Sequence, residues 1–294
     1  MGEDALVARL VELVPRDSDP LAGPGDDCAV IDSGSGELLL LKTDAMVAGV
    51  HFLPETPAEA VGWKAVARVV SDFAAMGGKP RHFLVTLAVS AGTPLEWADG
   101  LYRGIGRCLR THHSVLAGGE TSRVPEGSAA VISISATGSV TRERLTLRST
   151  AKPGDVLLVT GTMGGSLLTG KHLDFSPRLK EADWLVSNFK PTAMMDISDG
   201  LAKDLPRLAL ASGCGFVLDR ASLPVTAGCD MAQALGDGED FELLMSMEPA
   251  KQLDLLRAWQ AAFPDVPLSV IGRMVGAGQG EQLSGGWDHF GGCP

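Results

Sequence analysis

Two spacings of apolar residues alternate along this chain of 294 residues. In two segments the apolar positions recur every three to four residues, as on one face of a helix: 58–75 and 201–211. Shorter runs, either continuously apolar or alternating with small polar residues, are typical of strands and occur at 37–42, 82–89, 130–140 and 215–218. Because strand-like and helix-like segments alternate in both halves, the sequence predicts an α/β protein.

A change of composition separates the two halves near residues 140–150. The basic stretch TRERLTLRSTAK (141–152) leads into the turn signal KPGD, and a new apolar run, VLLVTG (156–161), follows it. A chain of this length can bury two cores of ordinary size. We therefore expect two α/β domains, residues 1–140 and residues 141–294.

The charge of the chain argues against several kinds of partner. It contains 25 Lys and Arg against 36 Asp and Glu, a formal net charge of −11, and no basic block. Such a chain is poorly suited to bind nucleic acid or an anionic membrane surface. The apolar runs are far shorter than a membrane span, and the early acids of MGEDALVARLVELVPRD do not fit a signal peptide. We expect neither nucleic acid nor a membrane as partner.

Cysteine and histidine give no sign of a zinc site. The histidines form no HExxH pattern, and the five cysteines include no CxxC pair: Cys28, Cys108, Cys214, Cys229 and Cys293. Scattered cysteines of this kind favour free thiols in a reducing compartment. We therefore expect a cytoplasmic protein.

Acidic residues stand where an apolar run ends and a helix begins in the stretch MMDISDGL (194–201). Ser198 occupies the position expected for an N-cap, and Asp199 falls in the expected first turn, where the helix dipole favours an anion. Capping alone would explain both residues. The second interpretation is that Asp196 and Asp199 hold a metal ion.

Four other stretches place carboxylates beside glycine or near the end of an apolar run: PGDD (24–27), LKTDAMVAGVHF (41–52), VSDFAAMGG (70–78) and LAGGETS (116–122). Each alone is more typical of a turn or a cap. Asp72 has apolar neighbours, however, and an unpaired buried carboxylate is costly. Five such stretches together favour Mg2+, which prefers hard oxygen ligands and bridges carboxylates to substrate phosphates. The sequence has no P-loop or protein-kinase motif.

Seven motifs in a fixed order resemble those of one enzyme family. They are GDDCAV, TDAMVAGVHF, WKAVARVVSDFAAMGG, LAGGETS, LRSTAKPGD, MMDISDGL and GDGEDFELL. With these motifs the chain resembles the thiamine-monophosphate kinases, which belong to the superfamily of aminoimidazole ribonucleotide synthetase and selenophosphate synthetase. The resemblance runs from about residue 20 to the closing WDHF (287–290), and VHF and WDHF favour this family over its relatives.

The resemblance implies a fold of two α/β domains. The N-terminal domains would pair in a homodimer to form a barrel-like sheet, and the C-terminal domain would be a sandwich-like α/β domain. ATP would bind in a groove near the dimer interface and transfer its γ-phosphate directly to thiamine monophosphate, which gives thiamine diphosphate. Such a transfer needs alignment and charge neutralisation more than a nucleophilic side chain. Several Mg2+ ions would screen the two phosphorylated anions.

The resemblance also implies three groups of site residues. The implied magnesium ligands are Asp27, Thr43, Asp44, Asp72, Glu120, Asp196 and Asp199. The implied nucleotide contacts are His112, Gly119, Glu120, Arg148 and Ser198. Asp199 and Arg148 would act in catalysis. The implied contacts to the thiamine part, whose thiazolium cation suits an acid and an aromatic ring, are His51, Glu239 and Trp287.

Several residues depart from the pattern of the family. Lys42 stands where the family often has a small hydroxyl residue, Glu120 replaces an aspartate, and His112 stands where an aromatic residue is expected. An ammonium at position 42 would pair with Asp27 or Asp72, so we expect this site to bind fewer magnesium ions than its relatives. Two alternatives stay open: an enzyme of the superfamily with another substrate, and a nucleotide-binding relative without catalysis.

Some of the implied contacts also have plain structural explanations. Arg148 fits a solvated charge on a hairpin, Trp287 fits a core anchor for the tail, and His51 fits a core histidine whose ring bonds to the backbone. Cys293 resembles the C-terminal cysteine of a hydrogenase-maturation relative, although here Pro294 follows it.

Overall fold

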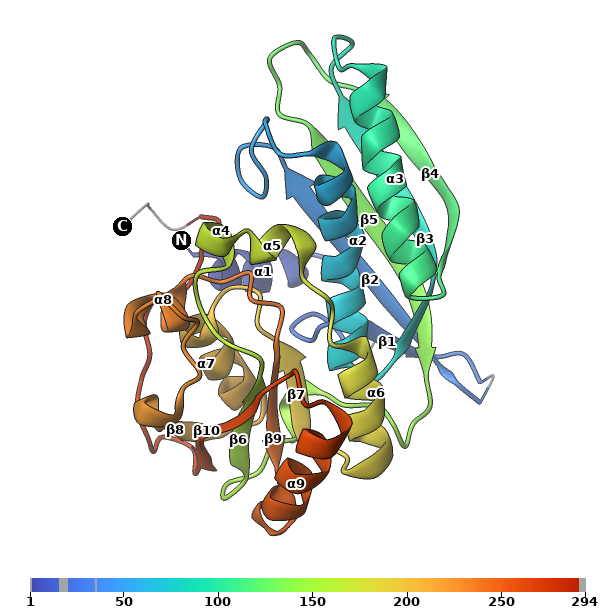
Figure 1. Ribbon diagram of the computed structural model, residues 1–294. Helices are drawn as coiled ribbons and strands as arrows, with labels where there is room; N and C mark the ends of the chain where they lie inside the picture. The colour runs from blue at the N-terminus through green and yellow to red at the C-terminus, as the bar shows by residue number, and fades with distance from the viewer. Residues whose placement is uncertain (1, 16–20, 35, 291–294) are drawn as a thin grey trace.

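Each half of the chain contains one five-stranded sheet (Figure 1). The computed structural model describes residues 2–15, 21–34 and 36–290, so Cys293 lies outside the described residues. The N-terminal sheet has the strand order β1-β2-β5-β3-β4, and the C-terminal sheet has the order β7-β9-β6-β10-β8. The prediction of an α/β fold is therefore confirmed. The last strand of the first sheet ends at Val140, and the first strand of the second sheet begins at Val156.

The N-terminal sheet is antiparallel except at one edge, where β3 and β4 run parallel. Its strands are β1 (Ala29–Asp32), β2 (Leu38–Val47), β3 (Lys79–Val89), β4 (Val115–Arg123) and β5 (Val131–Val140). Two long helices cover one face of this sheet (Figure 1): α2 (Ala58–Ala75) and α3 (Leu95–Thr111). Apolar side chains on the other face and at the β4 edge are exposed, among them Leu84, Val115 and Leu116.

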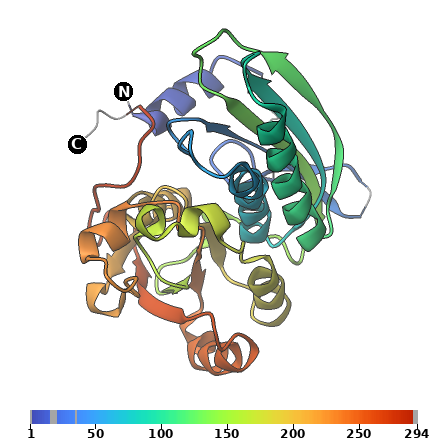
Figure 2. The ribbon, with the colours of Figure 1, turned by 45° about the horizontal axis from the view of Figure 1, so that its top comes forward.

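The C-terminal sheet is antiparallel and lies between two helical layers (Figure 2). Its strands are β6 (Val156–Thr160), β7 (Ala193–Asp196), β8 (Gly215–Leu218), β9 (Leu243–Met247) and β10 (Leu268–Val275). One cluster of buried apolar residues joins the sheet to α7 (Leu201–Ala211) and α8 (Met231–Gly236). A second joins it to α6 (Leu179–Asn188) and α9 (Gln252–Ala262). This layering is the expected α/β sandwich.

The remaining helices are short or peripheral. They are α1 (Glu3–Val11), α4 (Ser166–Thr169), α5 (Lys171–Asp174) and the 3-10 turns η1 (Arg148–Thr150), η2 (Arg220–Ser222) and η3 (Pro249–Lys251). Helix α1 buries no side chain and is held mainly by charge: Lys203 and Arg207 of α7 pair with Glu3 and Asp4. No helix in the described part of the chain is long and apolar enough to cross a bilayer.

Helix α2 packs against both halves of the molecule. Its Trp63 donates a hydrogen bond to the Phe175 carbonyl over 2.9 Å, and the Phe175 ring stacks on Phe241 with a centroid distance of 4.1 Å. Phe175 and Phe241 belong to the same buried cluster as the N-terminal core. Near the other end, Ala74 packs with α6 and the C-terminal sheet. The apolar pattern over 58–75 reflects burial on nearly all sides rather than on one face.

Two polar stretches lie within strands, although the sequence suggested turns or strand ends. The run 37–42 continues as β2 to Val47, because Lys42, Thr43 and Asp44 pair with β5 in unbroken register. The stretch LAGGETS lies within β4, an edge strand whose residues are mostly exposed. Polar side chains are acceptable in both places because alternate positions of β2 and most of β4 face away from the core.

The close crossing of α2 and α3 depends on Gly104. A Cβ added there would lie 1.9 Å from the Glu59 carbonyl oxygen on α2. We expect Gly104→Ala to push the helices apart and lower the free energy of unfolding by ~1–3 kcal/mol in urea titrations. Gly106→Ala is the matched control, because its Cβ would meet only the flexible Arg110 side chain. Equal stability of the two variants would contradict this account of the crossing.

Candidate functional site

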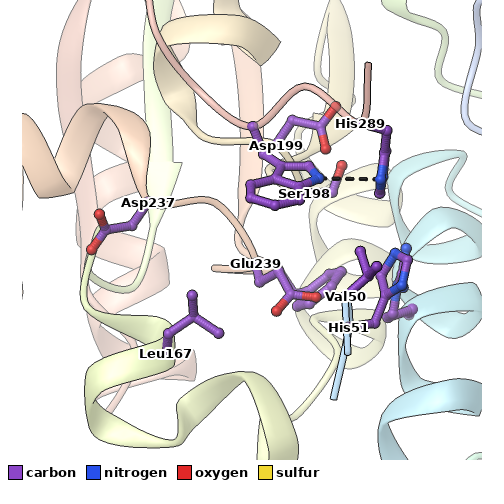
Figure 3. A pocket seen from close by; sticks show the side chains of 11 residues that line it. Val50, His51, Leu167, Ser198, Asp199, Asp237, Glu239 and His289 are labelled. Carbon is purple, nitrogen blue, oxygen red and sulfur yellow. Dashed lines mark hydrogen bonds between the residues drawn. The ribbon is translucent and has the colours of Figure 1, made fainter. Parts of the chain in front are cut away.

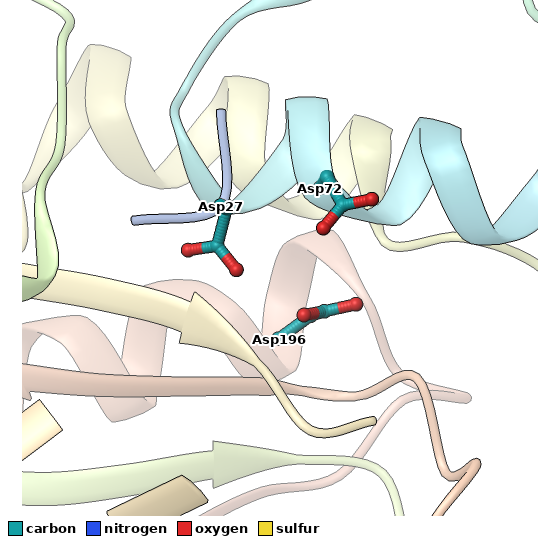
Figure 4. A group of neighbouring side chains, drawn as sticks. All are labelled: Asp27, Asp72 and Asp196. Atoms are coloured by element: carbon teal, nitrogen blue, oxygen red, sulfur yellow. The ribbon is translucent and has the colours of Figure 1, made fainter. Parts of the chain in front are cut away.

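Three buried carboxylates meet where the two halves of the chain join (Figure 4). Asp27 precedes β1, Asp72 lies on α2, and Asp196 ends β7. Each offers a carboxylate oxygen, and these atoms lie within 4.8 Å of one another. The side chains are nearly inaccessible, with residue exposures of 1%, 7% and 3%. Residues that are far apart in the sequence thus form one acidic cluster.

Burial makes the charges of this cluster unfavourable. Burial, with the nearby charge of Asp27, raises the pKa of Asp196 to about 6. Burial, opposed by Lys42 and assisted by the neighbouring carboxylates, raises the pKa of Asp72 well above its usual range. Close carboxylates in a poorly solvated site repel one another unless a cation lies between them. The cluster therefore needs positive charge from neighbouring side chains or from a bound cation.

Side chains around the cluster neutralise it in part. Lys42 Nζ lies 2.6 Å from Asp72 Oδ1, and Ser71 Oγ donates to Asp196 Oδ2 over 2.6 Å. Arg148 forms a two-pronged pair with Asp27, at 2.5 Å from Nη2 and 3.1 Å from Nε. The pairing expected for Lys42 is thus present, and Arg148 is buried rather than a solvated hairpin charge.

The cluster fits the ligand chemistry of Mg2+. All three groups supply hard carboxylate oxygens, the set Mg2+ prefers, and they contain no sulfur or imidazole donor. The excess of negative charge left after Lys42 and Arg148 supplies the attraction. The chemical type and the close spacing of these donor atoms support a magnesium site.

A pocket adjoins the same helix and brings the three expected thiamine contacts together (Figure 3). It is lined by Val50, His51, Arg68, Leu167, Ser198, Asp199, Asp237, Glu239, Phe241, Trp287 and His289. His51 comes from the loop after β2, Glu239 from the turn before β9, and Trp287 from the C-terminal segment. Both halves of the chain therefore build its wall.

The His51 ring has a defined tautomer and protonation state in this pocket. Its Nδ1 accepts a hydrogen bond from the Val47 amide over 3.0 Å, so Nε2 carries the proton of the neutral ring. Burial, with the charge of Arg68, lowers the pKa of His51 to about 4. The His289 ring lies beside it, with a centroid distance of 5.2 Å. His51 is thus a neutral donor at neutral pH.

Glu239 is held ionised by the Lys64 ammonium and the His172 ring behind it. Although burial opposes ionisation, contacts with His172 and Lys64 lower the pKa of Glu239 to about 2. Lys64 Nζ lies 2.8 Å from the carboxylate, and the Lys64 side chain is fully buried. The Glu239 backbone adopts φ of 55°, a left-handed conformation that costs a non-glycine residue energy. Its amide bonds to the Ser198 carbonyl over 2.7 Å, which fixes this turn.

Trp287 and Asp199 are joined at the rim of the pocket. The Trp287 amide donates to the Asp199 carbonyl over 2.8 Å, and the indole Nε1 donates to His289 Nδ1 over 3.2 Å. The Trp287 residue is 48% exposed, so it is not a core anchor. The Asp199 carboxylate pairs with Arg207 at 2.6 Å and Lys203 at 3.2 Å. Asp199 lies in this pocket and is not one of the three clustered carboxylates.

The predicted N-cap at Ser198 is wrong. Helix α7 begins at Leu201, with Gly200 in the N-cap position, so Asp199 precedes the helix. The carboxylate of Asp204 instead accepts from the amides of Ser198 and Asp199, at 3.0 and 2.9 Å. Because the side chain of Asp204, in the first turn of α7, accepts hydrogen bonds from these two amides, the side chains of Ser198 and Asp199 are not needed to cap them.

Thr43 and Asp44 occupy successive positions on β2 and face opposite sides of the sheet. Asp44 Oδ2 lies 3.0 Å from Arg68 Nη2, which places this carboxylate next to the pocket. Thr43 Oγ1 lies 3.1 Å from Ser135 Oγ and is exposed. Only Asp44 of this pair therefore contacts a residue that lines the pocket.

Three expected nucleotide contacts lie away from the cluster. Gly119 is in one row of the sheet with Asp44, through Ile134 on β5 and Val85 on β3. Three strand spacings separate the two positions by ~14 Å. Glu120 follows on the same edge strand, and its carboxylate accepts from Ser122 Oγ over 2.8 Å. His112 ends α3, with its ring 6.3 Å from that of Trp63.

Two cations of the site, Lys64 and Arg68, were not predicted from the sequence, and neither were the lining residues Asp237 and His289. A signal was present: Lys64, Arg68 and Asp72 follow one another at intervals of four in an otherwise apolar helix. Residues at this spacing share one face. Charged residues on a buried face need partners, and the partners here are the pocket and the cluster.

Comparisons with known proteins agree with this arrangement. Residues 25–140 match the family described as AIR synthase related protein, N-terminal domain, and residues 152–282 match the corresponding C-terminal domain. The thiamine-monophosphate kinase of Synechococcus elongatus is 34% identical over 279 residues, which cover 85% of this chain and 83% of that protein. The thiamine-monophosphate kinase of Rhodopirellula baltica is 36% identical over 272 residues, with coverage of 86% and 83%.

Two solved structures share the fold over nearly the whole chain. The structure described as AaThiL complexed with AMPPCP and TMP has a TM-score of 0.84 at 27% identity, covering 98% of this chain and 97% of that one. The thiamine monophosphate kinase of Aquifex aeolicus has a TM-score of 0.78 at 27% identity, with coverage of 96% and 97%. The family expected from the motifs is confirmed: the chain belongs to the AIR synthase related family and, within it, to the thiamine-monophosphate kinases.

Proposed function

We propose that this chain transfers the γ-phosphate of ATP to thiamine monophosphate in the presence of Mg2+, releasing thiamine diphosphate and ADP. The observation that supports this most is the position of two complementary sites along α2. Asp72 of the acidic cluster follows Arg68 of the pocket by four residues, ~6 Å along the helix axis. Relatives named thiamine-monophosphate kinase, and a relative described in complex with AMPPCP, an ATP analogue, and TMP, support the same reaction.

The acidic cluster is suited to the nucleotide end of this reaction. Asp27, Asp72 and Asp196 would hold Mg2+, which supplies charge neutralisation and alignment to the phosphates. The planar fork of Arg148 is taken up by Asp27, so Arg148 would contact phosphate oxygens through its remaining donors. Asp44 would add a further oxygen ligand from β2.

The pocket is suited to the acceptor. Glu239 presents a fixed negative charge for the cationic thiazolium, and Trp287 presents an exposed aromatic ring. The neutral His51 offers one N–H donor. The acceptor phosphate oxygen forms the new bond to phosphorus while the bond to the leaving ADP breaks, so no enzyme nucleophile is needed. Asp199 lies in the same pocket and is our candidate for steering the phosphate or its metal.

We propose a homodimer that uses the N-terminal sheet. The edge strand β4 is mostly exposed, with apolar Val115 and Leu116 55% and 45% accessible, and Leu84 on β3 is 48% accessible. An edge with unpaired backbone groups and apolar side chains favours association with another chain. In such a dimer, Glu120 would reach a nucleotide near the interface, although it is remote from the cluster of its own chain.

The central test is product formation by the wild type and by Asp196→Asn. We expect wild-type protein to form thiamine diphosphate from thiamine monophosphate, ATP and Mg2+, measured by chromatography. Asp196→Asn is expected to lower kcat by a factor of ~100 or more, as for groups that organise transition-state charge. The same substitution is expected to raise Tm without metal, because it removes a buried repulsive charge.

Asp254→Asn, an exposed change on α9, serves as the control and should leave both quantities unchanged. Full activity of Asp196→Asn would rule out the assigned role of the cluster. Absence of wild-type product together with tight ATP binding would favour the non-catalytic relative.

The second prediction concerns Lys42. Its ammonium already contacts Asp72 at 2.6 Å and so takes the place of one cation. We expect Lys42→Met to bind more Mn2+ per chain than the wild type in the presence of AMPPCP, counted by electron paramagnetic resonance. Lys79→Met, at an exposed lysine, provides the control. Equal ion counts in wild type and Lys42→Met would refute the substitution of a cation by Lys42.

The third prediction is a pH dependence that comes from His51. Its folded-state pKa of about 4 lies below the unfolded value of 6.5, so the folded state binds fewer protons between these values. The contribution of His51 to stability should therefore rise as the pH increases from 4 to 6.5, whereas buried carboxyls with a raised pKa, such as those of Asp196 and Asp204, contribute in the opposite direction. In thermal melts, His51→Gln should remove the share of His51, so that stability rises less, or falls more, with pH over this range than it does in the wild type. An unchanged slope would show that the His51 ring is not buried in its neutral form.

A further inference from the structure

Arg68 has an incomplete set of partners. It lies on α2, lines the pocket, and keeps only 13% of its side chain exposed. Its Nη2 contacts both oxygens of Asp44, at 3.0 and 3.2 Å. Its Nε and Nη1 are buried and have no hydrogen-bond partner. Among the buried side-chain nitrogen and oxygen atoms of the described residues, the one other unpartnered atom is His112 Nε2.

An arrangement of this kind is costly in the ligand-free protein. A guanidinium stays charged at any relevant pH, so it cannot reduce the cost by losing a proton. A buried N–H group without a partner costs ~1–3 kcal/mol. Sites that tolerate such groups are commonly completed by something that binds there. The missing partner must accept hydrogen bonds and, beside a cation, carry negative charge.

The other cations near the pocket have full sets of partners. Lys64 Nζ, buried behind Glu239, has three polar partners, the His51 carbonyl, His172 Nδ1 and Glu239, at 2.7 to 2.9 Å. Lys203 and Arg207 are paired with the acids of α1 and with Asp199. Donor capacity for a new anion therefore lies with Arg68.

The carboxylates that line the pocket are Asp199, Asp237 and Glu239, and Arg68 is the lining cation with spare donors. Glu239 and Arg68 are close enough for the charge of Arg68 to contribute to the lowered pKa of Glu239. The acceptor in the proposed function has the opposite pair, a thiazolium cation and a phosphate. The free N–H groups of a guanidinium donate charge-assisted hydrogen bonds to phosphate oxygens.

We propose that Arg68 binds the phosphate group of the acceptor, an inference that rests on the proposed function. Asp44 holds Nη2 and orients the guanidinium, so that Nε and Nη1, which donate on different sides of the group, stay available to an anion. The phosphate would then lie on the same helical face as Asp72, toward the acidic cluster. Arg68 would distinguish the phosphorylated acceptor from thiamine itself.

The test compares the affinities of thiamine monophosphate and thiamine, measured by calorimetry on the full chain without nucleotide. We expect Arg68→Gln to weaken binding of thiamine monophosphate by a factor of ~10–100, the loss of a charged hydrogen-bonded pair. Binding of thiamine and the KM for ATP should stay within a factor of two. Arg68→Lys, which keeps the charge but loses the planar fork, should fall between wild type and Arg68→Gln.

Two control variants separate the possible outcomes. Glu239→Gln should weaken thiamine and thiamine monophosphate alike, because both contain the thiazolium. Arg107→Gln, at a partly exposed arginine over the Trp63 ring, should change neither affinity. The Tm of each variant shows whether it folds. If Arg68→Gln does not fold, Arg68→Lys replaces it in the comparison.

The results decide the inference and the proposed function separately. The assignment of Arg68 would be overturned if Arg68→Gln weakened the binding of thiamine monophosphate and thiamine equally, or if it affected only ATP. Unchanged binding of thiamine monophosphate would also overturn it, while wild-type turnover would leave the proposed reaction standing. If the wild type binds neither thiamine compound, the proposed function itself fails.

Discussion

The mutual repulsion of three buried carboxylates is the constraint around which this molecule is arranged. Asp27, Asp72 and Asp196 come from different elements, and their oxygens approach within 4.8 Å. No single domain could hold them there, because Asp196 ends a strand of the second sheet and the others belong to the first half. The joint between the halves depends on apolar packing elsewhere, notably that of the stacked Phe175 and Phe241 rings against the N-terminal core.

Helix α2 connects this cluster to the neighbouring pocket. Three charged side chains follow one another at intervals of four residues along this helix. The Lys64 ammonium has all its partners, the Arg68 guanidinium has spare donors, and the Asp72 carboxylate is crowded by other carboxylates. A rigid helix fixes the spacing of these groups better than a loop would. The glycine at the α2–α3 crossing secures the position of the helix, so an apolar contact remote from the chemistry sets the geometry of the charges.

Much of the fold was predictable from the hydrophobic pattern. The helices 58–75 and 201–211 and the strand 215–218 match α2, α7 and β8, because long periodic segments leave little ambiguity. The site was only partly predictable. Motif resemblance identified Asp27, Asp72 and Asp196, which the fold brings together. It gave no sign that Glu120 lies three strands from Asp44, since that distance follows from strand order. Ser198 is not a cap because α7 begins only at Leu201, and Asp204 in its first turn accepts from the Ser198 and Asp199 amides.

The two-pronged contact between Arg148 and Asp27 has a consequence for how such sequences diverge. The arginine follows the first sheet and the aspartate precedes it, 121 positions earlier, yet each is buried against the other. Loss of either alone strands a buried charge, a far more damaging change than losing both together. A substitution at one position is therefore tolerated only with a compensating change at the other. A hybrid that joins the first half of one homologue to the second half of another would keep this contact only where both parents have the pair.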